Sequence, residues 1–107
     1  MGLDLFLRET RPCIVWEGGI THNLNSMAEA AGLYQCLWRP EELGIDIAQQ
    51  MIEPLRKGIE TLERDKESLE KRNPENGWGN YDNLLNLARK YLAACEEAPN
   101  AEVVVSR

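Results

Sequence analysis

The hydrophobic positions at the start of the chain repeat with a period of two. Three leucines occupy every second position within residues 2–8 (GLDLFLR), which predicts a β-strand with one apolar face. Residues 9–12 (ETRP) have the composition of a turn, and residues 13–17 (CIVWE) are rich in β-branched and aromatic side chains, which favours a second strand. We expect the two strands to form a β-hairpin.

Beyond the hairpin, the apolar spacing changes to that of a helix. The glycine pair 18–19 interrupts the strand pattern, and apolar residues then recur at helical spacing from Leu24 onward. Thr21 or Asn23 can cap the free amides of the first turn. A connector that contains proline and glycine, residues 39–45, separates this short helical region from the next helix.

The next helix is predicted to be long. Its apolar stripe begins at Ile47, and Asp46 with Gln49 fits a capping box at its start. Pro54 lies inside the stripe, removes one backbone hydrogen bond and predicts a kink. The charged run 64–72 fits either a protein-binding face or a solvated helix end with i,i+4 pairs, and we favour the second interpretation.

The last third of the chain predicts one more helix and one more strand. Residues 73–80 (NPENGWGN) are a loop rich in Asn, Gly and Pro, and Asn80 can cap the helix that follows. The proline-containing segment 98–100 stops this helix. Residues 101–107 (AEVVVSR) then predict a third strand.

These elements predict an α+β fold in a single domain that spans residues 1–107. We expect a small three-stranded mixed sheet, made of the β-hairpin plus the C-terminal strand and covered by about three helices on one face. The pattern leaves open whether the last strand pairs beside the first or the second. A three-stranded sheet has edges that must be covered or paired, so we expect a homodimer, with strand 101–107 as one edge that can pair with another copy.

Charge narrows the range of partners. Asp and Glu outnumber Lys and Arg by 18 to 12, which gives a net charge of -6. Long nucleic acids and anionic membranes are bound mainly through clustered cations, so we expect neither as a partner. One small anionic ligand, held by one or two local cations, stays compatible with this balance.

The cysteines and the first residues bear on location and chemistry. The three cysteines, Cys13, Cys36 and Cys95, are widely spaced, so we expect reduced apolar side chains rather than disulfides or a metal site. The first residues alternate like a strand and lack the pattern of a signal peptide. We therefore expect a cytoplasmic protein, that of the host cell if the chain is phage-encoded, without a metal or cofactor.

Polar and aromatic residues that belong to no apolar stripe occur in three segments, 18–23, 38–41 and 73–81. We hypothesise that these segments meet in one pocket. The candidate ligand-binding residues are Thr21, His22, Asn23, Arg39, Asn76, Trp78 and Tyr81.

Each of the main candidates has a structural alternative. His22, the single histidine, can bind an anion or act as a base, or it can bond to backbone at a turn. Arg39 can clamp a phosphate or carboxylate, or it can cap a helix or pair with Glu41 or Glu42. Trp78 can stack on a ligand, or it can plug the core from its loop, which we favour.

Several motifs together resemble a small uncharacterised family found in bacteriophages and bacteria. The similarity would cover nearly the whole chain, from GLDLFL through ITHNLNSMAEAAGLYQCLWRPEE and NPENGWGNYDNLLNLARKYLAAC to PNAEVVVSR. Its most specific parts are Thr21, His22, Asn23, Leu24, Met27 and Ala28, then Asn76, Gly77, Trp78, Gly79 and Tyr81. The resemblance implies a phage-type accessory protein that counters host defence, but no particular reaction.

Three functions follow as hypotheses. The first is a binding module that sequesters a small anionic, nucleotide-like ligand, with Trp78 or Tyr81 stacking and Arg39 and His22 meeting phosphate. The second is a protein–protein interaction module that inhibits a host protein. The third is a small hydrolase with His22 as general base, and it ranks last because no partner for His22 stands out; we expect a non-enzyme.

Overall fold

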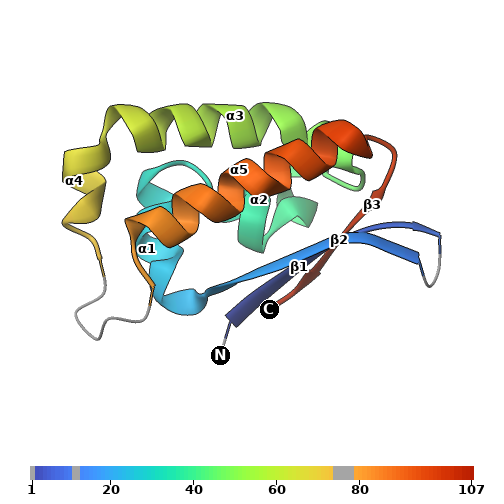
Figure 1. Cartoon of the computed structure of the whole chain (residues 1–107), viewed down its shortest axis with the longest axis horizontal. Helices are drawn as coiled ribbons and strands as arrows, with labels where there is room; N and C mark the ends of the chain where they lie inside the picture. Colours follow the sequence, from blue (N-terminus) through green and yellow to red (C-terminus); the bar gives the residue numbers. More distant parts are fainter. Residues whose placement is uncertain (1, 11–12, 74–78) are drawn as a thin grey trace.

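The computed structural model describes residues 2–10, 13–73 and 79–107 and contains a three-stranded sheet with helices on one side (Figure 1). The elements, in chain order, are β1 (Gly2–Thr10), β2 (Cys13–Thr21), the 3-10 turn η1 (His22–Leu24), α1 (Asn25–Ala30), α2 (Tyr34–Trp38), the 3-10 turn η2 (Pro40–Leu43), α3 (Ala48–Arg64), α4 (Lys66–Glu70), α5 (Tyr81–Glu97) and β3 (Glu102–Ser106). The predicted α+β class is confirmed. In place of about three predicted helices, the described chain has the five helices α1–α5 and two 3-10 turns.

The sheet has the strand order β2-β1-β3, so the first strand is central. β1 and β2 form the predicted hairpin, and β3 pairs with β1, which decides the question that the sequence left open. Both pairings are antiparallel, so the prediction of a mixed sheet was wrong in this detail. A hairpin on one side and a return strand on the other give β1 an antiparallel neighbour on each side.

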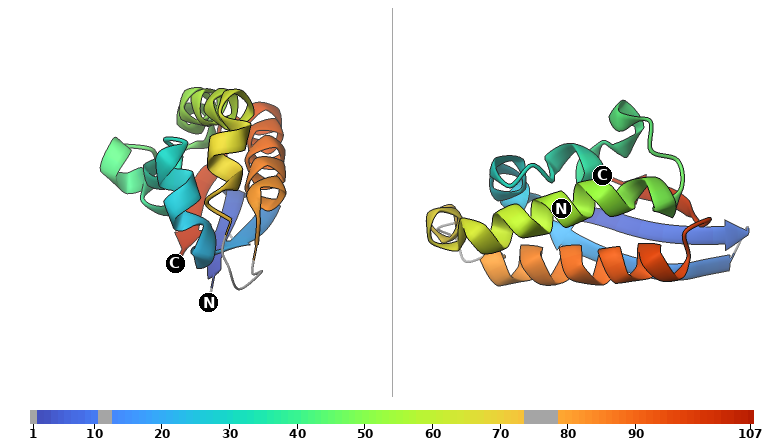
Figure 2. Two further views of the ribbon diagram at one scale, coloured as in Figure 1. Left: turned by 90° about the vertical axis from the view of Figure 1, so that its left-hand side faces the viewer. Right: turned by 90° about the horizontal axis from the view of Figure 1, so that it is seen from above.

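The alternation of β1 decides which face of the sheet the helices cover. Leu3, Leu5 and Leu7 are fully buried, whereas Asp4 on the other face is exposed. All helices lie on the leucine face, as the views in Figure 2 make clear. The opposite face of the sheet is not covered by any described element.

β2 is longer than predicted. Gly18 and Gly19 were expected to end the strand, yet they continue it and pair with Leu5 and Asp4 of β1. Glycine is unfavourable in a strand but does not prevent ladder hydrogen bonds. The strand ends at Thr21, whose hydroxyl accepts a hydrogen bond from the amide of Asn23 (3.3 Å) and caps η1.

The start of α3 differs from the prediction by one residue. The capping side chain is that of Gln50, not Gln49: its Oε1 accepts from the amides of Asp46 (2.7 Å) and Ile47 (3.1 Å). The helix continues through Pro54 to Arg64, and a separate short helix, α4, begins after Asp65 and turns away from the α3 axis (Figure 1).

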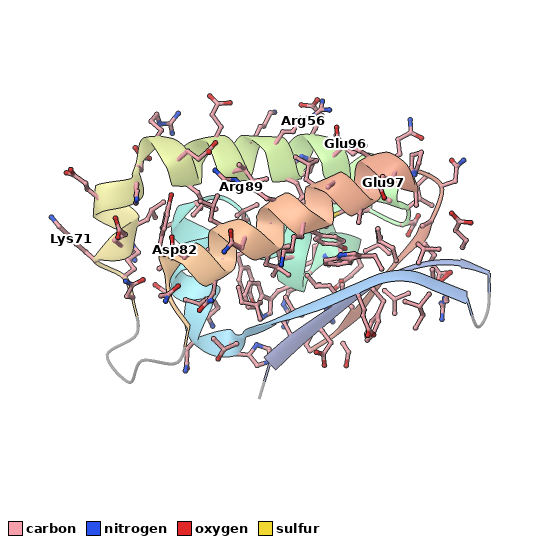
Figure 3. All side chains as sticks on the ribbon, viewed as in Figure 1. Arg56, Lys71, Asp82, Arg89, Glu96 and Glu97 are labelled. Carbon is pink, nitrogen blue, oxygen red and sulfur yellow. The ribbon has the colours of Figure 1, made fainter. Side chains whose placement is uncertain are left out.

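α3 and α5 lie side by side above the sheet and are joined at their exposed surfaces by ion pairs. Arg56 of α3 bonds to Glu96 of α5 (2.8 Å), and Arg89 of α5 bonds to Glu63 of α3 (Figure 3). Asn80 caps α5 as predicted, because its Oδ1 accepts from the amide of Asn83 (3.0 Å). No helix of the described part of the chain has the length and apolarity needed to cross a membrane.

The two buried tyrosines of α5 differ in how their hydroxyls are satisfied. Tyr91 stacks on Trp16 of β2, with ring centroids 4.8 Å apart, and within the described residues its buried hydroxyl has no hydrogen-bond partner. Tyr81 donates its hydroxyl to the carbonyl of Leu62 (2.6 Å). The pair therefore allows a direct test of the cost of an unsatisfied polar group.

We predict that Tyr91→Phe leaves the free energy of unfolding unchanged or raises it by about 1 kcal/mol, because it removes a hydroxyl that is desolvated without a partner. The matched variant Tyr81→Phe should lower it by about 1 kcal/mol, since the Leu62 carbonyl loses its donor. Urea unfolding of both variants is the measurement. An equal loss in the two variants would mean that the Tyr91 hydroxyl has a partner after all.

We also predict that stability falls at alkaline pH. Burial raises the pKa of the Cys36 and Cys95 thiols from the ordinary value of 9.0 to about 12. Between these values the unfolded chain loses protons that the folded chain keeps. The contribution of the two buried thiols to the free energy of unfolding is therefore complete below pH 9 and is lost as the pH rises toward 12. Urea midpoints across this range should drop less steeply in the double variant Cys36→Ala/Cys95→Ala. An unchanged slope would contradict the assignment.

Candidate functional site

An open hollow of the described surface lies between β2 and the first half of α5. It is an open groove of about 550 Å³. Its lining comes from the outermost strand on one side and one helix face on the other: Trp16, Glu17, Gly18, Gly19, Ile20, Thr21, Gly79, Asn83, Asn86, Leu87 and Lys90. We call this hollow the β2–α5 groove.

The hydrogen-bond pattern of the sheet determines which backbone groups of β2 point into this groove. Val103 of β3 donates its amide to the carbonyl of Asp46 (2.9 Å), away from β1. Neighbouring residues of an antiparallel strand direct their N–H and C=O groups to opposite sides, so Val104 faces β1 and pairs there with Phe6. The backbone N–H and C=O groups of Phe6 therefore point toward β3, and those of its neighbour Leu5 point toward β2.

The same alternation extends to the free edge. Leu5 pairs with Gly18, so Gly18 directs its backbone groups into the sheet, and Glu17 and Gly19 direct theirs out of it. No described residue bonds to these outward groups, and β2 has β1 as its one neighbour in the sheet. As far as the described residues extend, the donors and acceptors of Glu17 and Gly19 are therefore open to another strand.

The glycines of β2 shape the floor of the groove. A Cβ on Gly18 would lie 2.6 Å from Cη2 of Trp16 and 3.1 Å from Cδ1 of Leu87. The indole of Trp16 therefore covers Gly18 on its way to the stack with Tyr91, and a larger residue at 18 would displace it. This close approach explains a glycine inside a strand.

The wall opposite the edge is one polar face of α5. Asn83, Asn86 and Lys90 follow one another at helical spacing and all line the groove. Asn83 is engaged in the helix cap, where its Oδ1 accepts from the amide of Asn80 (2.9 Å). The side chains of Asn86 and Lys90 have no such engagement with described residues, so they are available to an occupant.

Exposed apolar side chains continue the edge beyond the groove. Ile14 and Val15 are 50% and 42% exposed, and they are two of the three large exposed hydrophobic residues found in the described ranges. They lie on the arm of the hairpin that extends past the end of α5 (Figure 1). A free backbone edge and exposed apolar side chains thus occur on the same strand.

Three of the predicted site residues lie where β2 passes into η1. Thr21 lines the groove and caps η1. His22 turns to the other side, where its Nδ1 accepts a hydrogen bond from the indole of Trp38 (2.9 Å). Asn23 is exposed, and its backbone amide completes the cap on Thr21.

Arg39 lies at the end of α2, outside the groove. A hydrogen bond with the Tyr34 hydroxyl raises the pKa of its guanidinium. The neighbouring carboxylate of Glu41 pairs with Arg107 instead (3.1 Å). Hydrogen bonding to its own backbone lowers the pKa of Glu41 by more than burial raises it, and the hydrogen bond and charge of Arg107 lower it further.

Tyr81 lies in the core, so the prediction that it stacks on a ligand does not agree with its position. Its ring is held between α5 and the end of α3, where its hydroxyl reaches Leu62. Burial, and then the nearby carboxylate of Glu63, raise the pKa of this hydroxyl. The predicted contributions of Asn76 and Trp78 lie outside the described residues.

The three predicted segments therefore meet in part. Segment 18–23 lies between the other two: Thr21 packs against Gly79, where an added Cβ would be 2.6 Å from its Cγ2, and His22 bonds to Trp38. Of the predicted residues, Thr21 lines the groove. Sequence reasoning missed Glu17, Gly19 and the α5 residues, although the unexplained Gly18–Gly19 pair was a signal.

This part of the molecule offers hydrogen-bonding groups and charged side chains. The hydrogen-bond partner that the described residues offer His22 is the indole of Trp38, which neither donates nor takes a proton in acid–base catalysis. Across the described ranges, no three His, Cys, Asp or Glu side chains gather closely enough to hold a metal ion. The groups that the groove offers are backbone N–H and C=O groups, the Glu17 carboxylate, the Thr21 hydroxyl, the Asn86 amide and the Lys90 ammonium group.

Comparisons of the chain with known protein families, with curated proteins and with solved structures found no match. The resemblance to a phage and bacterial family, based on the motifs around His22 and Gly79, therefore stays a prediction.

We predict that His22→Ala lowers the free energy of unfolding by about 1–2 kcal/mol, because the mostly buried indole N–H of Trp38 loses its acceptor. The neighbouring variant Asn23→Ala is the matched control and should change stability by less than about 0.5 kcal/mol, as expected for an exposed side chain. Urea unfolding compares the two. Equal stability of His22→Ala and the wild type would contradict this structural role of His22.

Proposed function

We propose that this protein is a binding module that adds an extended polypeptide segment to its sheet at the free edge of β2. The observation that carries the proposal is the open edge itself: the backbone groups of Glu17 and Gly19 point out of the sheet and have no partner among the described residues. Strand addition uses such groups for affinity and flanking pockets for specificity. The β2–α5 groove supplies the flanking space.

The contrast between the two edges supports this proposal. The outer side of β3 is partly occupied, because Asp46 and Ala48 bond to Val103 and Ala101 there. Proteins usually protect an exposed edge with lysine, proline or very short strands. Residues 13–21 (CIVWEGGIT) contain neither residue type, and their one charge is Glu17. The register shifts of β2 against β1, which can also protect an edge, lie at Cys13–Trp16 and leave Glu17 and Gly19 in regular pairing.

A small polar or anionic ligand in the same groove is the second candidate. Lys90 provides a cation there, and Asn86 and Thr21 provide hydrogen-bonding groups. This version is closest to the nucleotide-like ligand that the sequence suggested, although it uses Lys90 rather than Arg39 and His22. The anti-defence setting stays a prediction that rests on the family resemblance.

The test uses peptides of about 12 random residues displayed on phage, since a strand of about 5–6 residues is the usual length to be matched. We predict that selection on the wild-type protein enriches peptides whose binding to Glu17→Pro is at least about tenfold weaker. Proline removes the outward N–H of residue 17 and places its ring on the free edge, while the bonds between β1 and β2 stay intact. Isothermal titration calorimetry with the enriched peptides measures the loss.

Glu17→Gln is the matched control, because it keeps the backbone N–H and the length of the side chain. Both variants should unfold at nearly the wild-type urea concentration. If no peptide is enriched, or if enriched peptides bind Glu17→Pro as well as the wild type, the edge does not accept a strand. A thermal shift with nucleotides that disappears in Lys90→Ala would then favour the second candidate.

A further inference from the structure

The uncovered face of the sheet carries an unbalanced negative charge next to the free edge. A shallow hollow on this face is lined by Asp4, Phe6, Glu17 and Gly18. Phe6 pairs with Glu17 across the β1–β2 ladder, and Asp4 precedes Phe6 by two residues on the same strand face. Two carboxylates thus lie around one half-buried aromatic ring.

The cation nearest to these carboxylates along β1 is already engaged. Arg8, on the same face, is paired with Glu102 of β3, on the far side of the sheet from β2. Asp4 and Glu17 form no ion pair with any described residue. Among the described residues, the carboxylates on the β2 side of this face therefore have no positive partner.

A strand added beside β2 would bring one side chain directly opposite Glu17. Residues opposite each other in neighbouring strands have Cβ atoms about 4.5–5.5 Å apart, and opposite charges at such positions attract whereas like charges repel. A Lys or Arg side chain there would meet Glu17, and its apolar stem can lie toward Phe6. Ile14 and Val15, further along the edge, would meet apolar side chains of the same segment.

A second copy of this chain does not fit that requirement. Two β2 strands paired antiparallel about Gly19 would place Glu17 opposite Thr21, and residues 13–21 contain no basic residue to offer. Each copy would also bring a net charge of -6 to the contact. The charge balance favours a foreign, basic segment.

We infer that the segment bound at the β2 edge is an extended basic–apolar peptide, with a Lys or Arg opposite Glu17 and apolar residues opposite Ile14 and Val15. The inference rests on the proposed function and names its partner class. This protein supplies the carboxylate of the contact, and the protein that it binds supplies the cation.

The experiment uses synthetic peptides based on the tightest binder from the display selection, each with Lys, Gln or Glu at the position that faces Glu17. To find that position, each peptide residue is replaced in turn, and the position sought is the one at which the effect on binding differs between the wild type and Glu17→Lys. We expect the wild type to prefer Lys over Glu by about fivefold to tenfold, Glu17→Gln to lose the preference and Glu17→Lys to reverse it. Unfolding of both variants checks that the fold is kept.

The possible outcomes distinguish a failure of strand addition from a failure of the charge pairing. If binding is lost in Glu17→Pro but no position of the peptide responds to Glu17→Lys, the edge accepts a strand and the inferred charge pairing is overturned. If no peptide binds, the proposed function fails and the inference fails with it. A dimer mass in light scattering that returns to the monomer in Glu17→Pro would assign the edge to a second copy and also overturn the inference.

Discussion

The central strand β1 places the strictest demand on the rest of this fold. Its three leucines are fully buried on one face, while its backbone bonds to a neighbour on each side. One face therefore needs a complete apolar cover, which α1, α2, α3 and α5 provide from a single side (Figure 2). The other face needs no cover, because the alternation places Asp4, Phe6 and Arg8 there.

The same arrangement makes the two outer strands unequal. β3 is short and meets the connector before α3, which takes part of its free backbone through Asp46 and Ala48. β2 has nine residues and lies beside α5, which approaches through Leu87, and no described residue bonds to the outward groups of Glu17 and Gly19. The proposed binding site is thus a result of how the helices are distributed and not of a separate loop built for binding.

Local patterns predicted most of the fold, and long-range pairing was beyond them. The period of two around Leu5 and the Asn80 cap depend on neighbouring residues, so they were visible in the sequence. The position of β3 was not, because a β-branched strand such as 102–106 fits beside either β1 or β2. The groove was missed for a similar reason: it forms only where α5 lies against β2, and Asn83, Asn86 and Lys90 are more than sixty residues away from Glu17 in the chain. Tyr81 was misassigned because an aromatic residue near a loop gives no local sign that Leu62 will accept its hydroxyl.

The strand order also bears on the order of folding during synthesis. β1 and β2 are made first, but β3, the second neighbour of β1, comes from residues 102–106 and meets it across almost the whole chain. Contacts of such high sequence separation form late and slow the folding of small domains. Until β3 has left the ribosome, the hairpin has two open edges, because β1 then lacks its second neighbour. The nascent chain is therefore most exposed to mispairing with other chains in this interval.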